Sequence, residues 1–170
     1  MGATTHISEA DYLHSVFEPD AEYVDGEVRE RPMGTYDHND WQQAIQRWFV
    51  ERAKDWNIRS VQEQRMRIKA GRYRIPDVSV LDRANPKEQV VTLAPIAVFE
   101  VLSPEDKVQE LCEKLDDYAG MRIPHIWVLD PKTAIFKRYA DASLMPLSRF
   151  AYPERGIEFD LAEIAALLQN

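Results

Sequence analysis

Two short apolar stretches, Arg74–Leu81 and Ile96–Ser103, constrain the fold of this chain more than any other feature. Val, Ile, Leu and Phe are their commonest residues, and Pro or charged residues bound them, which is typical of strands buried in a sheet. Each stretch carries one carboxylate, Asp77 in the first and Glu100 in the second. Removing a carboxylate from water is costly unless the group is ion-paired, hydrogen-bonded or bound to a metal. We therefore expect the function of the chain to account for these two acids.

Length and cysteine content predict the general class of the protein. The 170 residues suffice for one domain with a full hydrophobic core, so we expect a single domain over 1–170. No segment is long and apolar enough to span a membrane, and the N-terminus lacks the regions of a signal peptide. The single cysteine, Cys112, excludes an internal disulfide and favours a cytoplasmic location. Because Cys112 falls on the apolar face of an expected helix, we predict a buried thiol.

The order of helical and strand patterns predicts an α/β (α+β) fold with a central mixed sheet flanked by helices. Apolar periodicity and capping residues indicate helices over 8–15, 40–55, 104–119 and 160–168. Alternation and turn residues indicate two hairpins, over 21–29 and 65–75, and further strands over 76–81, 96–103, 124–130 and 135–139. Asn39 is expected to cap the second helix.

The second hairpin concentrates positive charge in a chain whose net charge is −8. That net charge argues against a nucleic-acid partner, yet residues 47–74 hold nine bases against three acids. With a two-residue turn at 70–71, Lys69 would face Arg72 and Arg67 would face Arg74. One face would then carry the basic residues Arg65, Arg67, Lys69, Arg72 and Arg74. The pattern leaves two readings open, a solvated edge strand protected by charge or a face that follows a phosphate backbone.

Asp77 and Glu100 predict a metal site if their two segments pair in one sheet. Two close carboxylates repel, and one is neutralised unless a cation lies between them. Oxygen ligands suit Mg²⁺ or Mn²⁺, which can polarise a phosphodiester and activate a bound water. Lys114 is the candidate to position that water, because its helix follows the Glu100 strand directly. Spacing alone also permits a solvent-exposed Glu110–Lys114 ion pair instead.

Several segments together resemble one family of proteins. The matching segments are Glu22–Glu27, His38 at the start of the first long helix, Ile75–Val78, Phe99–Pro104, Glu113–Tyr118 and Ile123–Pro131. In this order they are similar to the motifs of the Uma2 family, also called DUF820, of the PD-(D/E)XK nuclease superfamily. No single motif is specific, but their joint order and spacing are.

The resemblance implies a restriction-endonuclease-like fold and a metal-dependent DNA phosphodiesterase. It implies that Asp77 and Glu100 hold the metal, that Glu22 and His38 belong to the catalytic site, and that Lys114 replaces the superfamily lysine. A strict Glu-x-Lys motif would place that lysine at position 102, where this chain has Leu102. Taken without the family, Glu22 could be an ordinary hairpin acid and His38 could simply help to cap a helix.

Three functional hypotheses follow from these residues. The leading one is a cytoplasmic endonuclease that depends on Mg²⁺ or Mn²⁺, binds DNA along the basic hairpin, and acts as a homodimer. The second is a catalytically inactive module of the same fold that binds DNA or mediates assembly, motivated by Leu102 and the negative net charge. The third is a metal-dependent hydrolase acting on a small phosphorylated substrate, which would suit an acidic protein better.

Overall fold

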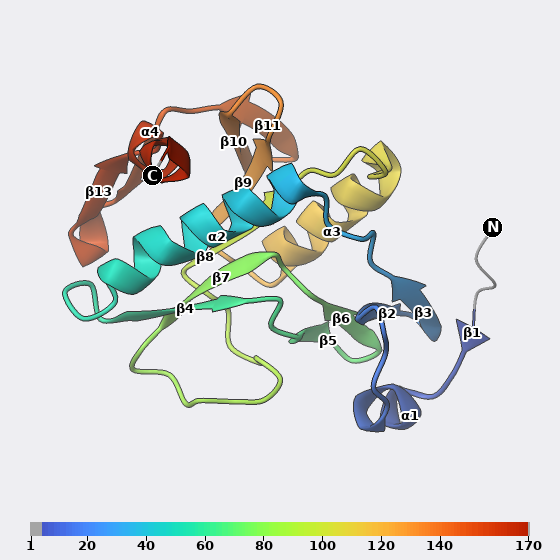
Figure 1. Ribbon diagram of the computed structural model, residues 1–170. Helices are drawn as coiled ribbons and strands as arrows, with labels where there is room; N and C mark the ends of the chain where they lie inside the picture. Colours follow the sequence, from blue (N-terminus) through green and yellow to red (C-terminus); the bar gives the residue numbers. More distant parts are fainter. Residues whose placement is uncertain (1–4, 170) are drawn as a thin grey trace.

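A six-stranded mixed sheet lies at the centre of the computed structural model, which describes residues 5–169 (Figure 1). In spatial order its strands are β11 (Ser143–Pro146), β10 (Ile135–Ala140), β9 (His125–Asp130), β8 (Ala97–Val101), β7 (Val78–Asp82) and β4 (Ile58–Gln62). Neighbouring strands are antiparallel except β8 and β9, which run parallel. The predicted α+β fold with a central mixed sheet flanked by helices is therefore confirmed.

Helices α2 (Tyr36–Glu51) and α3 (Val108–Gly120) cover opposite faces of this sheet. Successive residues of a strand point to opposite sides. Ala97 and Phe99 of β8 accordingly join the core that includes α2, and Val98 joins the core that includes α3. Helix α3 also makes the crossover between the parallel strands β8 and β9. By the same alternation, Glu100 faces α3.

A smaller sheet adjoins the central one on the side of α1 (Glu9–His14) (Figure 1). Its spatial order is β1 (Thr5–His6), β3 (Glu27–Glu30), β2 (Ala21–Val24), β6 (Arg72–Arg74) and β5 (Met66–Lys69). The predicted tight turn at Asp25 and Gly26 joins β2 to β3, and both residues have the positive φ that such a turn requires. Tyr12 of α1 stacks on Tyr23 and packs against Tyr73, which attaches the helix to this sheet.

The C-terminal segment packs against α2 and differs from the sequence prediction. It consists of β12 (Arg149–Tyr152), the 3₁₀ turn η1 (Pro153–Arg155), β13 (Ile157–Asp160), α4 (Ala162–Ala165) and the 3₁₀ turn η2 (Ala166–Gln169). Phe150 and Phe159 insert beside Phe49 of α2. The predicted helix over 160–168 is divided between α4 and η2, and the β12–β13 hairpin was not predicted.

Three further local predictions were wrong. Helix α2 begins earlier than expected because Thr35, rather than Asn39, caps it: its Oγ1 accepts the main-chain N–H of His38 at 3.3 Å. Helix α3 begins at Val108 rather than near residue 104. Cys112 is exposed, because the sheet takes only a narrow face of α3 that contains the buried Leu115.

The described helices place no segment across a lipid bilayer. The longest of them, α2, has 16 residues. None of the helices within residues 5–169 combines the length and apolarity that crossing a bilayer requires.

Candidate active site

The two acids singled out from the sequence, Asp77 and Glu100, lie at the same level of the β7–β8 pair. Asp77 immediately precedes β7, Glu100 belongs to β8, and their antiparallel register pairs Val78 with Phe99. The main-chain N–H of Val101 donates to Oδ2 of Asp77 at 2.7 Å, which ties the first carboxylate to the second strand. Asp77 is 3% exposed and Glu100 is 6% exposed. The expectation that the two segments pair in one sheet is confirmed.

Helix α3 supplies two polar partners for Glu100. The hydroxyl of Tyr118 donates to Oε1 at 2.6 Å, and Nζ of Lys114 lies 3.0 Å from Oε1 and 3.1 Å from Oε2. Residues four apart share one face of a helix, so both side chains reach the same carboxylate. Tyr118 was expected only as the last residue of the family-like segment Glu113–Tyr118, with no role in the site. Its spacing from Lys114 was the signal that could have placed it in the site.

Lys114 is held between carboxylates rather than in solvent. Its Nζ lies 2.8 Å from Oε1 of Glu22 and donates to the main-chain oxygen of Ile75 at 3.2 Å. Burial alone would lower the pKa of Lys114, but Glu100 and Glu22 raise it above its ordinary value, so the side chain is an ammonium. Glu110 pairs with Lys107 at 3.1 Å instead, so the alternative Glu110–Lys114 pair is excluded.

Glu22 of β2 connects Lys114 to a second group of charges. Its Oε1 accepts the main-chain N–H of Ile75 at 2.9 Å, and its Oε2 accepts Nη1 of Arg74 at 2.9 Å. Burial alone would raise the pKa of Glu22, but Lys114, Arg74 and these hydrogen bonds lower it overall. Glu22 is therefore a buried carboxylate fixed by three donors, and the ordinary hairpin acid is the wrong description of it.

Asp77 has a cationic partner that the sequence analysis missed. Nη2 of Arg31 donates to its Oδ1 at 2.6 Å, from the residue that follows β3. Burial alone would raise the pKa of Asp77, but His38, Lys114 and Arg31 lower it overall. Asp77 is therefore ionised at neutral pH. The only sequence signal for Arg31 was its place in an alternating strand pattern after the 25–26 turn.

His38 lies in the first turn of α2 with its ring turned into the site. Nε2 is 3.2 Å from Oδ2 of Asp77, and the residue is 7% exposed. Burial alone would lower the pKa of His38, but hydrogen bonding to Asp77 and its charge raise it overall. The ring does not cap the helix, because Thr35 does so.

The pKa values of the two neighbouring acids shift in opposite directions. Burial raises the pKa of Glu100 most; Lys114 opposes this effect, Asp77 adds to it, and the result is a pKa of about 7. The pKa of Asp77 is lowered, as described above. Such divergence between adjacent carboxylates is frequent in catalytic sites and marks a place where negative charge is incompletely balanced.

These side chains line a cleft of about 140 Å³ between β3, the start of α2 and α3. Its wall contains Glu22, Arg31, His38, Asp77, Glu100 and Lys114. Within residues 5–169 no group of three or more His, Cys, Asp or Glu side chains is arranged to hold a metal ion. Asp77 and Glu100 therefore offer two acidic oxygen donors, and a cation bound between them would need water or substrate oxygens as further ligands.

The second hairpin has a different register from the one predicted. Lys69 pairs with Arg72 as expected, but Arg67 pairs with Tyr73 and Met66 pairs with Arg74. The register shifts between Arg67 and Lys69, which moves the remaining pairs by one residue.

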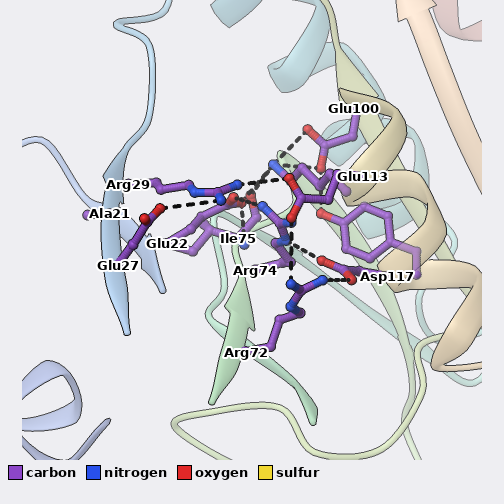
Figure 2. A network of polar contacts seen from close by, with 12 residues as sticks. Ala21, Glu22, Glu27, Arg29, Arg72, Arg74, Ile75, Glu100, Glu113 and Asp117 are labelled. Atoms are coloured by element: carbon purple, nitrogen blue, oxygen red, sulfur yellow. Dashed lines mark hydrogen bonds and ion pairs between the residues drawn. The ribbon is translucent and has the colours of Figure 1, made fainter. Parts of the chain in front are cut away.

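The predicted continuous basic face is consequently wrong. Arg72 and Arg74 bind Asp117 of α3, with Nη1 of Arg72 at 2.7 Å and Nε of Arg74 at 2.6 Å (Figure 2). Arg65 lies over the ring of Tyr12, 4.3 Å from its centroid, and Arg67 is 3.8 Å from Glu9. Lys69 is exposed. Two of the five bases thus neutralise internal acids instead of facing a ligand.

Comparison with known proteins places the chain in a family. A sequence model of Uma2, described as "Putative restriction endonuclease", matches residues 10–150. The chain belongs to the Uma2 family. No significant match was found among curated proteins.

A solved structure shares the fold of this Uma2 chain. The protein from Anabaena variabilis, described as a "putative nuclease belonging to DUF820", superposes with a TM-score of 0.81 and 18% identity, covering 95% of this chain and 99% of that one. At this identity the likeness concerns the fold. A second match, the DrdV–DNA complex, has a TM-score of 0.42 and 16% identity over 75% of this chain and 11% of that one, too low a score for an argument.

Proposed function

We propose that this Uma2 protein is an endonuclease that hydrolyses DNA phosphodiester bonds with the help of a divalent cation. One observation carries the proposal: two buried acids, Asp77 and Glu100, share an open cleft with the ammonium of Lys114, and the Glu100 carboxyl has a pKa raised to about 7. Buried carboxylates whose negative charge is only partly balanced, in a cleft open to solvent, favour the binding of a cation. The family description and the shared fold support nuclease chemistry.

The donor set fits Mg²⁺ or Mn²⁺. Both ions prefer carboxylate oxygens and retain waters, so two acids beside free space satisfy them. Asp77 and Glu100 would hold the ion, which would supply Lewis-acid polarisation of the phosphodiester and a more acidic bound water.

The surrounding side chains position these groups. Tyr118 and Lys114 orient Glu100, while His38 and Val101 orient Asp77. Glu22 and the main-chain oxygen of Ile75 fix the ammonium of Lys114. We propose that Lys114 positions the attacking water and stabilises the negative charge that develops on the phosphate. A fixed cation in a low-dielectric cleft stabilises such charge well.

Of the basic hairpin residues, only those whose side chains remain accessible are proposed to bind DNA. Arg67 and Lys69 of the hairpin are exposed and are proposed as backbone contacts. Arg72 and Arg74 are assigned to internal ion pairs instead. We further propose that the protein forms a two-fold dimer to cut both strands, and light scattering would test this. We also propose that it acts in the reducing cytoplasm.

A catalytically inactive module of the same fold is the second candidate. Arg31 already pairs with Asp77, and Lys114 pairs with Glu100, so the site has cations of its own. Strongly salt-dependent DNA binding with no cleavage under any cation would favour this function. Competition by mononucleotides, without affinity for duplex DNA, would indicate a hydrolase of small phosphorylated substrates instead.

The test is a plasmid cleavage assay in Mg²⁺, Mn²⁺ or EDTA. We expect cleavage to require the metal and to fall by at least about a hundredfold in Glu100→Gln and Lys114→Met, which remove a ligand and a stabilising charge. Glu158→Gln and Lys132→Met are the matched controls, because both side chains are exposed and neither lines the cleft. Wild-type protein that cleaves no DNA in either cation would refute the endonuclease. Cleavage that survives Lys114→Met would reject the role of the lysine alone.

A further inference from the structure

Arg31 makes a contact that the proposed chemistry does not explain. Its side chain is 15% exposed, and its Nη2 lies 2.6 Å from Oδ1 of Asp77. A guanidinium this close to a buried carboxylate forms a strong charge-assisted hydrogen bond. The contact is directed at one of the two acids proposed to hold the cation.

The two oxygens of Asp77 are used differently. Oδ2 accepts the main-chain N–H of Val101 and lies beside Nε2 of His38, so the protein scaffold holds it. Oδ1 instead accepts from Arg31, a side chain that itself lines the cleft. Arg31 therefore covers the oxygen of Asp77 that the scaffold does not hold.

Arg31 is held less firmly than the other buried arginine nearby. Arg74 is 3% exposed and has Glu22, Glu113 and Asp117 around it. Arg31 has Asp77 and, at 3.6 Å, Glu63, whose side chain is 50% exposed. Open cleft volume also adjoins Arg31. A long side chain with one buried partner and free space can exchange that partner for another anion.

We propose that Arg31 takes the cation position on Asp77 in the metal-free protein and transfers its guanidinium to a phosphate oxygen of the substrate when the divalent cation binds. The proposal rests on the proposed function for the identity of the cation and of the phosphate. The planar donors of guanidinium match phosphate oxygens as well as they match a carboxylate. Cation and DNA then favour each other's binding, because each removes a competitor of the other.

The first arm of the test measures binding of Mn²⁺ alone by electron paramagnetic resonance. Arg31→Gln should bind Mn²⁺ about tenfold more tightly than wild type, since no charge-assisted hydrogen bond has to be broken. Arg29→Gln is the matched control: it removes the same charge from the same cleft, yet Arg29 pairs with Glu27 and Glu113. Equal tightening in both variants would overturn the proposal and leave only a general charge effect.

The second arm measures the salt dependence of binding to a labelled DNA duplex, by anisotropy, in Ca²⁺ and in EDTA, with a gel to verify that the duplex is intact. Arg31→Gln should lose about one phosphate contact from the salt slope in Ca²⁺. In EDTA the slope should be unchanged, because Arg31 is then bound to Asp77. Arg29→Gln should act equally in both conditions. A loss for Arg31→Gln that is the same with and without the cation would overturn the exchange.

A measurement on wild-type protein guards against misfolding of the variant. The arginine Nε–Hε signal of Arg31, assigned with Arg31→Lys, should shift when Mg²⁺ is added, and an unchanged signal at saturating Mg²⁺ would contradict the proposal. Its failure differs from that of the endonuclease. If wild-type protein cleaves DNA but the Arg31 signal does not change with Mg²⁺, the exchange alone is refuted. If Arg31→Gln binds Mn²⁺ more tightly but wild-type protein cleaves no DNA, the endonuclease alone is refuted. No Mn²⁺ binding by wild type or variant refutes both.

Discussion

Two groups of buried charge lie next to each other in this protein and differ in balance. The arginine cluster consists of Arg72, Arg74, Glu113 and Asp117. The cleft cluster consists of Glu22, Arg31, Asp77, Glu100 and Lys114. In the arginine cluster each oxygen of Asp117 has its own guanidinium (Figure 2). In the cleft cluster one ammonium serves two carboxylates, and Glu100 is left with a pKa of about 7.

The comparison teaches that burial of charge does not by itself identify a functional site. Both clusters are largely removed from water, and both lie between α3 and the strands. The arginine cluster matches two guanidinium groups with two carboxylates and behaves as a structural connection between β6 and α3. The cleft cluster combines incomplete balance with open space, and that combination is what allows a cation or phosphate to enter.

The largest effect is expected from breaking the arginine cluster. Arg74→Met removes the guanidinium that pairs with both Asp117 and Glu22, and both carboxylates stay buried with one cationic partner each. Removing one member of a buried ion pair typically costs about 3–5 kcal/mol. We expect a loss of that size in the free energy of unfolding, measured by urea denaturation in EDTA. The double variant Arg74→Met/Asp117→Leu should recover part of the loss, and a double variant that is less stable than the single one would contradict the structural role.

The next effect concerns the pH dependence of the cleft cluster. The pKa of Glu100 rises from 4.5 to about 7 on folding, so the native state binds a proton that the unfolded state has lost. Its contribution to stability is complete below pH 4.5 and is lost as pH rises through about 7. Relative to Glu100→Gln, wild-type protein should therefore lose stability over this range, by at most about 3 kcal/mol.

The comparison with Glu100→Gln isolates this group from Glu22 and Asp77. Their lowered pKa values contribute stability that disappears at the acid side instead. The measurement is urea denaturation of both proteins in EDTA at several pH values. A constant difference between wild type and variant from pH 4.5 to 8 would show that Glu100 is not the unbalanced acid of the cleft.

A smaller change sharpens the assignment of Glu100. Tyr118→Phe removes the hydroxyl that donates to Oε1 at 2.6 Å, a hydrogen bond to the ionised form. We expect a loss of roughly 1–2 kcal/mol and a further rise in the pKa of Glu100, since this hydrogen bond lowers it. The midpoint of the pH transition in the preceding experiment should move upward. A midpoint that moves downward would mean that Tyr118 stabilises the protonated acid.

The smallest effect is expected for an exposed ion pair. Arg47 and Glu51 of α2 form an i,i+4 pair at 2.8 Å, with side chains that are 53% and 46% exposed. Arg47→Gln should change the free energy of unfolding by less than about 0.5 kcal/mol, because solvent screens such pairs. Arg47→Gln removes the same positive charge as Arg31→Gln and Arg29→Gln. It is therefore the reference for the effect of that charge change on stability in both variants. A loss of stability near that of Arg74→Met would contradict the expected difference between buried and exposed ion pairs.

Prediction from the sequence succeeded where local pattern and global fold agree. The strand that carries Glu100, the Asp25–Gly26 turn and the central mixed sheet all depend on local composition and alternation. Asp77, which was expected within a strand, lies just before β7. The basic hairpin failed for a physical reason: alternation states which residues share a face, but a bulge between Arg67 and Lys69 changes the register. Arg72 and Arg74 then meet Asp117, which is more than forty residues away in sequence.

The sequence by itself determined the strand that carries Glu100, the strand that follows Asp77, the helix that carries Lys114, and membership of the family through the order of its motifs. Only the tertiary structure decided which cation meets which acid. Electrostatic partners of a buried side chain are set by distances of a few ångströms between distant segments. Spacing along the chain therefore could not reveal that Arg31 lies on Asp77, that Glu22 holds Lys114, or that two of the five hairpin bases are internal.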